Sequence, residues 1–227
     1  MTINPKRMIK FLKSIKRINL KSIYINFHYF PFSTAIKIPI LVSKHTFLKQ
    51  LKGEIILKHR PDFGLIKIGF GDIGIFDKSR SRTILEIKGR ITFTGKTHIG
   101  HGSKISVWEG ADLIFGDNFE ISAESTIVAT NKIQFGKNIL ISWNVLIMDS
   151  DLHSIYSEGI LQNPPQPIKI GDNVWIGCNS TLLKGTIVGD NVVIGANSLL
   201  SRNYPINNVI LAGNPAIRIK ALTNWTV

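Results

Sequence analysis

The hydrophobic positions near the C-terminal end of the chain recur every six residues. In the stretch IGDNVWIGCNSTLLKGTIVGDNVVIGANSLL, glycine follows four of the six aliphatic residues that keep this spacing, which are Ile170, Ile176, Leu182, Val188, Ile194 and Leu200. A period of six fits neither a helix of 3.6 residues per turn nor an alternating strand, and it is typical of a parallel β-helix. We therefore predict short strands stacked in triangular coils, with the aliphatic residue inward and Gly or Asn at the bends.

The same period extends upstream. Two extra residues interrupt it between Ile127 and Phe135. Its members are Phe115, Ile121, Ile127, Phe135, Ile141 and Ile147. Still earlier, the residues alternate as in strands but with a ragged period. The sequence predicts an all-β chain whose solenoid covers residues 61–215. Because the end coils of a solenoid cannot bury both faces, residues 1–60 and the tail 216–227 are the segments available as caps.

The repeat stops at the segment MDSDLHSIYS, residues 148–157. One step beyond Ile147 stands His153, which we expect at the next inward position, and the period resumes only at Ile170. Prolines at 164, 165 and 167 cannot donate to a strand ladder, so residues 153–169 should leave the coil as an exposed loop. Polar residues at the root of such a loop are where solenoids carry function.

The basic residues concentrate at the N-terminus. The net charge is +13, and residues 1–60 hold 13 Lys and Arg against one acid, Glu54. Within the segment 1–21, apolar residues recur at helical spacing with basic residues between them. The apolar residues are Met8, Phe11, Leu12, Ile15 and Ile18. This predicts a basic amphipathic helix. It either caps the main domain or lies on an anionic membrane, with residues 1–42 as the peripheral contact.

The overall composition limits the compartment and the partners. Cys178 is the only cysteine, so no intramolecular disulfide can form, and no secretory signal is evident. We expect a cytoplasmic protein, placed at the inner face of the membrane if its basic segment binds there. The isoelectric point near 9.9 is also typical of nucleic-acid-binding proteins, but no recognised nucleic-acid-binding motif accompanies the basic residues. We therefore expect no nucleic-acid partner.

The repeat, followed by ILAGNPAIRIK at 210–220, resembles the hexapeptide-repeat acyltransferases. The resemblance covers about residues 115–220. It implies a left-handed parallel β-helix, a homotrimer with active sites between subunits, and acetyl-CoA as cosubstrate. The order of DSDLHSIYS, a loop and GDNVWIG is most similar to O-acetyltransferases that act on sugars of capsules or lipopolysaccharides, including sialic-acid capsules.

The resemblance implies that His153 is the general base. Acetyl transfer from a thioester to a sugar hydroxyl requires removal of the hydroxyl proton, and imidazole titrates near neutral pH. The transfer would be direct, without an acyl-enzyme. Asp149 or Asp151 could orient the imidazole, or each could only shape the turn through its own backbone. Trp175 would line the acetyl-transfer site beside the histidine, with subunit packing as the alternative.

Binding residues for the two substrates follow from their positions. Trp143 and Asn144, one repeat before the histidine, could contact the acceptor, although a bend also favours asparagine. Coenzyme A carries phosphates, so its groove should offer cations and close backbone approach. The candidates in the last coils are Lys184, Gly195, Ala196, Arg202, Gly213, Arg218 and Lys220.

Other functions remain open at this point. An N-acetyltransferase of an amino-sugar differs from an O-acetyltransferase only in the acceptor atom, which the sequence hardly separates. A non-catalytic scaffold that binds a membrane or an acidic glycan would need no base. A γ-type carbonic anhydrase shares the β-helix but needs three histidines around a metal, two of them close in sequence. No such pair accompanies His153, so we expect no metal.

Overall fold

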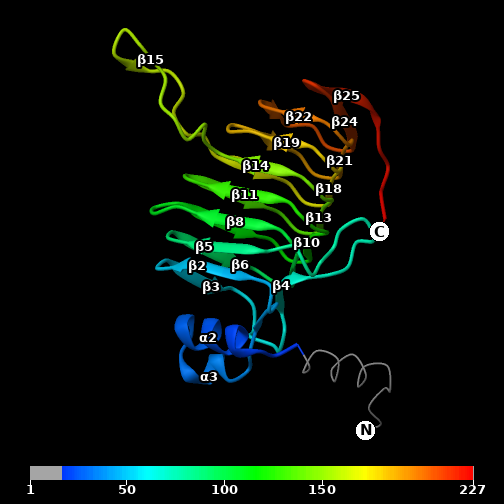
Figure 1. Ribbon diagram of the computed structural model, residues 1–227. Helices are drawn as coiled ribbons and strands as arrows, with labels where there is room; N and C mark the ends of the chain where they lie inside the picture. The colour runs from blue at the N-terminus through cyan, green and yellow to red at the C-terminus, as the bar shows by residue number, and fades with distance from the viewer. Residues whose placement is uncertain (1–16, 227) are drawn as a thin grey trace.

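Each turn of the chain contributes one short strand to each of three parallel sheets, which stack into a triangular β-helix (Figure 1). The computed structural model describes residues 17–226. Most of the predicted basic amphipathic helix therefore lies outside the described residues.

The strands of the three sheets follow one another in the order A, B, C along the chain. Sheet A holds β1 (Ile40–Val42), β4 (Ile66–Phe70), β7 (Thr97–Gly100), β10 (Phe119–Ile121), β13 (Ile139–Ile141), β18 (Val174–Ile176), β21 (Val192–Ile194), β24 (Val209–Gly213) and β25 (Ala216–Ala221). Sheet B holds β2 (Phe47–Leu51), β5 (Ile84–Ile87), β8 (Lys104–Val107), β11 (Thr126–Ala129), β14 (Leu146–Met148), β19 (Thr181–Leu182) and β22 (Leu199–Leu200). Sheet C holds β3 (Glu54–Leu57), β6 (Arg90–Phe93), β9 (Asp112–Phe115), β12 (Lys132–Phe135), β17 (Ile168–Ile170), β20 (Ile187–Val188) and β23 (Asn203–Tyr204).

The six-residue period is confirmed as the inward column of the coil. All six aliphatic residues from Ile170 to Leu200 are buried, as are the upstream members from Phe115 to Ile147. Between sheets C and A the bends carry asparagines in the left-handed region, with φ of 55° at Asn138 and 56° at Asn173. Their amides stack between coils, because Asn173 Nδ2 donates to Asn191 Oδ1 at 2.8 Å. The six-residue repeat therefore specifies both the buried core positions and the asparagines at the bends.

The coil begins at Ile40, well before the predicted boundary at residue 61. β1, β2 and β3 pair in parallel with β4, β5 and β6, so residues 40–57 form part of the solenoid. The period is ragged here because the early coils are longer. In sheet A the neighbour of Ile66 in the next coil is Thr97, whereas the neighbour of Val174 is Val192, which is much nearer along the chain.

Different elements close the two ends of the coil. Helices α2 (Leu20–Tyr29) and α3 (Phe32–Ala35) cover the first coil (Figure 1). At the other end, β25 runs antiparallel to β24, and the following residues bring Trp225 back to the outer face of sheet A. Within residues 17–226, no helix is long and apolar enough to cross a bilayer.

Candidate active site

A loop of residues 149–167 leaves the coil at the corner between sheets B and C and ends in the antiparallel pair β15 (Tyr156–Ser157) and β16 (Ile160–Leu161) (Figure 1). The prediction that His153 points inward is wrong, since residues 151–162 are all exposed. Asp149, the first residue of the loop, is the last buried residue before this exposed stretch. The chain therefore leaves the coil earlier than the period suggests.

Asp149 anchors the root of the loop to the coil below it. Its Oδ1 accepts hydrogen bonds from Thr130 N at 2.7 Å and Thr130 Oγ1 at 2.9 Å, and its Oδ2 accepts from Asn131 N at 2.9 Å. Its carbonyl oxygen accepts from Gln166 N at 3.0 Å, which ties the returning end of the loop to the same point. Both carboxylate oxygens thus face the preceding corner and not the imidazole of His153.

Asp151, Asn163 and Lys184 form a second tie, which we call the loop clasp. Lys184 Nζ donates to Asp151 Oδ2 at 2.6 Å and to Asn163 O at 3.0 Å, and Asn163 Nδ2 donates to Asp151 Oδ2 at 2.8 Å. The hydrogen bond from Lys184, with that from Asn163, holds the pKa of Asp151 below its usual range. Asn163 was not predicted from the sequence, where its only signal is its place before two prolines at the end of the loop.

The loop clasp fixes the backbone around His153 and leaves its ring free. Asn163 Nδ2 also donates to the carbonyl oxygen of His153 at 2.8 Å, and Asn163 Oδ1 accepts from Ile155 N at 2.6 Å. Among residues 17–226, no hydrogen bond or ion pair involves the imidazole of His153. The loop around it also presents apolar side chains to solvent, namely Leu152, Ile155, Tyr156, Ile160 and Leu161.

Trp175 lies on a different side of the coil. It projects from β18 in sheet A, and in a triangular coil that sheet lies across from the corner between sheets B and C. Its Nε1 donates to Ser142 Oγ at 3.1 Å, and its ring lies 6.1 Å from that of Trp225. Within one chain the structure does not bring Trp175 to His153, so the two could lie side by side only across a boundary between subunits.

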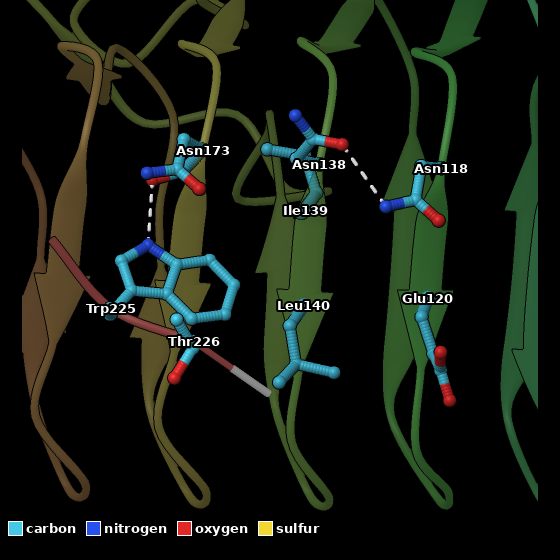
Figure 2. A pocket seen from close by; sticks show the side chains of 8 residues that line it. All are labelled: Asn118, Glu120, Asn138, Ile139, Leu140, Asn173, Trp225 and Thr226. Atoms are coloured by element: carbon cyan, nitrogen blue, oxygen red, sulfur yellow. Dashed lines mark hydrogen bonds between the residues drawn. The ribbon is translucent and has the colours of Figure 1, made fainter.

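A shallow cavity of about 220 Å³ lies on the outer face of sheet A beside these tryptophans (Figure 2). Trp225 Nε1 donates to Asn173 O at 2.9 Å, which holds the indole against the sheet. Glu120 lines the far side, and a hydrogen bond from His98 holds the pKa of its carboxyl below the usual range. This cavity was not predictable from the repeat, because Trp225 and Thr226 of the tail after β25 complete its wall.

The remaining candidates lie at the corner between sheets A and B, at the corner between sheets B and C, and on strands β24 and β25. Trp143, Asn144, Gly195 and Ala196 lie at the corner between sheets A and B, and Gly213 is the last residue of β24. Asn144 has a φ of 56°, as its bend requires. A Cβ at Gly195 would come within 2.9 Å of the Ala212 Cβ, so coil packing alone explains that glycine.

The four basic candidates for the coenzyme A groove differ in their availability. Lys184 is engaged in the loop clasp. Arg202 donates to Ala216 O at 3.4 Å and lies over the Tyr204 ring. Arg218 and Lys220 are exposed on β25, with no acidic partner in the part of the chain that the structure describes. Among those same residues, no group of three or more His, Cys, Asp and Glu side chains is placed to hold a metal ion.

Comparison with known proteins finds relatives that carry the same six-residue repeat or are named acetyltransferases. Residues 167–202 match the family model described as bacterial transferase hexapeptide (six repeats). A putative lipopolysaccharide biosynthesis O-acetyl transferase of Escherichia coli is 32% identical over 148 residues, 61% of this chain and 75% of the relative. A putative acetyltransferase of Saccharomyces cerevisiae is 38% identical over 116 residues, 50% of this chain and 58% of the relative, so the match spans little more than half of the yeast protein.

The crystal structure of the polySia specific acetyltransferase NeuO superposes with a TM-score of 0.63 at 22% identity, covering 83% of this chain and 79% of that one. At this identity the superposition shows the shared fold. Three observations indicate the same family: the inward hexapeptide column, the three parallel sheets and the match to the Escherichia coli relative. The chain therefore belongs to the hexapeptide-repeat acyltransferases and winds as a left-handed parallel β-helix.

Proposed function

We propose that the protein transfers an acetyl group from acetyl-CoA to a sugar hydroxyl of a bacterial-type surface polysaccharide, with His153 as general base. The observation that carries the proposal is the free imidazole of His153, held on a backbone that the loop clasp fixes, in a chain related to a protein named as a lipopolysaccharide O-acetyl transferase. A base must reach the proton of an incoming hydroxyl, and a ring without a partner among residues 17–226 is available for it.

The reaction needs no covalent enzyme intermediate. The sugar oxygen attacks the thioester carbonyl carbon while His153 takes the hydroxyl proton; the C–O bond forms, the C–S bond breaks, and the proton returns to the thiolate of coenzyme A. A backbone N–H near the carbonyl would stabilise the oxyanion. We place the phosphates of coenzyme A against Arg202, Arg218 and Lys220, and we leave Lys184 to the loop clasp.

The arrangement of the candidates supports a homotrimer with sites between subunits. In one chain, Trp175 and His153 lie on opposite sides of the coil, so only a second copy can bring a Trp175 to a His153. The exposed apolar side chains around His153 are suited to burial against such a copy. Asp149 and Asp151 then act as positioning residues for the loop, and Trp143 and Asn144 remain proposed acceptor contacts.

The test is incubation of the purified protein with acetyl-CoA and a panel of de-O-acetylated surface glycans and amino-sugars, read by thiol release, mass and NMR. We expect O-acetylation of at least one glycan and a loss of at least about 100-fold in His153→Ala, because general base catalysis typically contributes 10²–10⁴-fold. His59→Ala, at an exposed histidine of the early coils, is the matched control and should retain full activity.

Three results would contradict the proposal. Full activity in His153→Ala would remove the base from the mechanism. Acetylation of amines alone would favour an amino-sugar N-acetyltransferase. No transfer to any acceptor by well-folded trimer would favour a scaffold without catalysis.

A further inference from the structure

Helix α2 buries two polar side chains, Ser22 and Asn26, beside the apolar Ile25. Asn26 Nδ2 donates to Ile40 O at 2.7 Å, and Ile40 N donates to Asn26 Oδ1 at 3.1 Å. Ser22 Oγ makes the same pair of contacts with the carbonyl and N–H of Val42, at 3.1 and 2.9 Å. These two buried side chains thus satisfy the backbone groups of β1, the edge strand of sheet A. Polar residues that a surface helix usually turns to water are used here to close the coil.

A second set of apolar residues on α2 faces away from the protein. Its residues follow the i, i+3, i+4, i+7 spacing of one helical stripe. Together with the first residue of α3 and the residue that caps its C-terminus they form what we call the cap face, which consists of Leu20, Ile23, Tyr24, Phe27, Phe32 and Ile36. Leu20 is 83% exposed and Phe32 is 71% exposed, and the rings of Phe27 and Phe32 lie 6.1 Å apart. A contiguous exposed apolar face of this kind marks a binding surface.

The charge around the cap face is positive. Residues 17–60 hold eight Lys and Arg and one acid, Glu54, which is itself paired with Arg90 at 3.0 Å. Lys37, next to Ile36, is exposed, whereas Lys21 donates to the carbonyl oxygens of Lys44 and Thr46. Lys49 pairs with Glu86, but no Asp or Glu occurs between residues 17 and 53. A second copy of the chain docked on this face would therefore bring like charges together, whereas an anionic surface would be attracted.

We propose that the cap face docks on an anionic lipid bilayer, with its aromatic and aliphatic side chains in the headgroup region and the surrounding cations against lipid phosphates. Aromatic residues beside Lys and Arg are the composition that interfacial segments use. Helices α2 and α3, which carry the cap face, lie at one end of the coil, and the loop that holds β15 lies toward the other (Figure 1). Docking would thus stand the solenoid on the membrane and keep the loop away from the lipid.

The experiment measures sedimentation of the full-length protein with phosphatidylcholine vesicles, with and without phosphatidylglycerol. The parent should bind only the anionic vesicles. Phe27→Ser/Phe32→Ser keeps every cation and should lower the partition coefficient at least about tenfold, since burying each phenyl ring contributes favourably to transfer. Ile217→Ser/Ile219→Ser, two exposed residues of β25 at the far end of the coil, is the matched control and should bind like the parent.

The same variants distinguish this proposal from the enzymatic one, because the readout is binding and not acetyl transfer. We expect Phe27→Ser/Phe32→Ser to keep its thermal midpoint and its activity on a soluble acceptor. Equal binding of anionic vesicles by this variant and the parent would overturn the proposal, as would absence of vesicle binding by the parent. End-to-end association of the parent that the double substitution abolishes, with vesicle binding unchanged, would show a protein interface instead and would also overturn it.

Discussion

Asp149→Asn tests whether the loop depends on its buried root. The carboxylate is fully buried and accepts three hydrogen bonds, two on Oδ1 and one on Oδ2. An asparagine of the same shape must present its NH2 group either to Asn131 N–H or to the two groups of Thr130, so at least one buried donor loses its acceptor. A buried unsatisfied donor costs about 1–3 kcal/mol, and hydrogen bonds to a charged group contribute more than neutral ones.

We therefore expect the free energy of unfolding to fall by about 2–4 kcal/mol. For a chain of this size each kcal/mol lowers the melting temperature by about 2–4 °C, so the midpoint should fall by at least about 4 °C. The assay is urea unfolding together with calorimetry. Asp151→Asn is the control, because that carboxylate is 40% exposed and its pair with Lys184 is partly screened, so its loss should cost at most about 1 kcal/mol.

The activity of Asp149→Asn separates the two roles weighed for this residue. If Asp149 acts by anchoring the loop, the pH profile of kcat/KM should keep its shape while its height falls. An unchanged melting temperature combined with a shifted profile would refute the reasoning, since it would mean that the carboxylate contacts the imidazole in the working enzyme.

Three further changes have defined outcomes. Ile194→Ala removes a fully buried member of the inward column and should lower the free energy of unfolding by about 2–5 kcal/mol in urea titrations; a loss below about 1 kcal/mol would contradict the packing described. Lys184→Met removes the cation of the loop clasp and should speed proteolytic cleavage within residues 151–162, with little change in the melting temperature; unchanged cleavage would show that the clasp does not order the loop. Because the folded pKa of Asp151 is lowered, its contribution to loop order is complete above the usual aspartate value near 4 and is lost only as pH falls through the lower folded value. Cleavage of the parent loop should therefore be constant from about pH 5 to 8, and a rise within that range would exclude Asp151 as the group that holds it.

Much of the fold was predictable because one residue in six carries the core. The spacing from Phe115 to Leu200 predicts the inward column, and its interruption after Ile147 predicts the exposed loop. The start of the coil was not predictable, because the early coils are longer than the later ones and bury their strands without a fixed period. The ragged pattern upstream of residue 85 therefore hid β1, β2 and β3.

The candidate site was only partly predictable, since a period gives the coil position of a residue but not its contacts. The six-residue period predicts that His153 points inward. The coil ends earlier, because Asp149 hydrogen-bonds to Thr130 and Asn131 and the chain leaves the coil after it. Asn163 lies well beyond His153, in a proline-rich stretch with no repeat, and its role depends on a turn that the sequence pattern does not specify. Trp175 occupies an outward slot of sheet A, and a period read along one chain does not say which residues of a second subunit would face it.

The stacked asparagines between sheets C and A repeat one corner from coil to coil. Asn191 Nδ2 donates to Asn208 Oδ1 as Asn173 does to Asn191, so each coil offers its neighbour the same surface. A complete coil, such as the one that separates Val174 from Val192, could then be added or removed without a new kind of contact. In sheet B, four steps separate β2 at the cap from β14 at the loop, which at ~4.8 Å per step is about 19 Å. The number of coils between them thus sets the height of the loop above the cap face, and deletion of one coil that precedes β11 would lower it by about 5 Å while leaving the bonds of Asp149 to Thr130 and Asn131 in place.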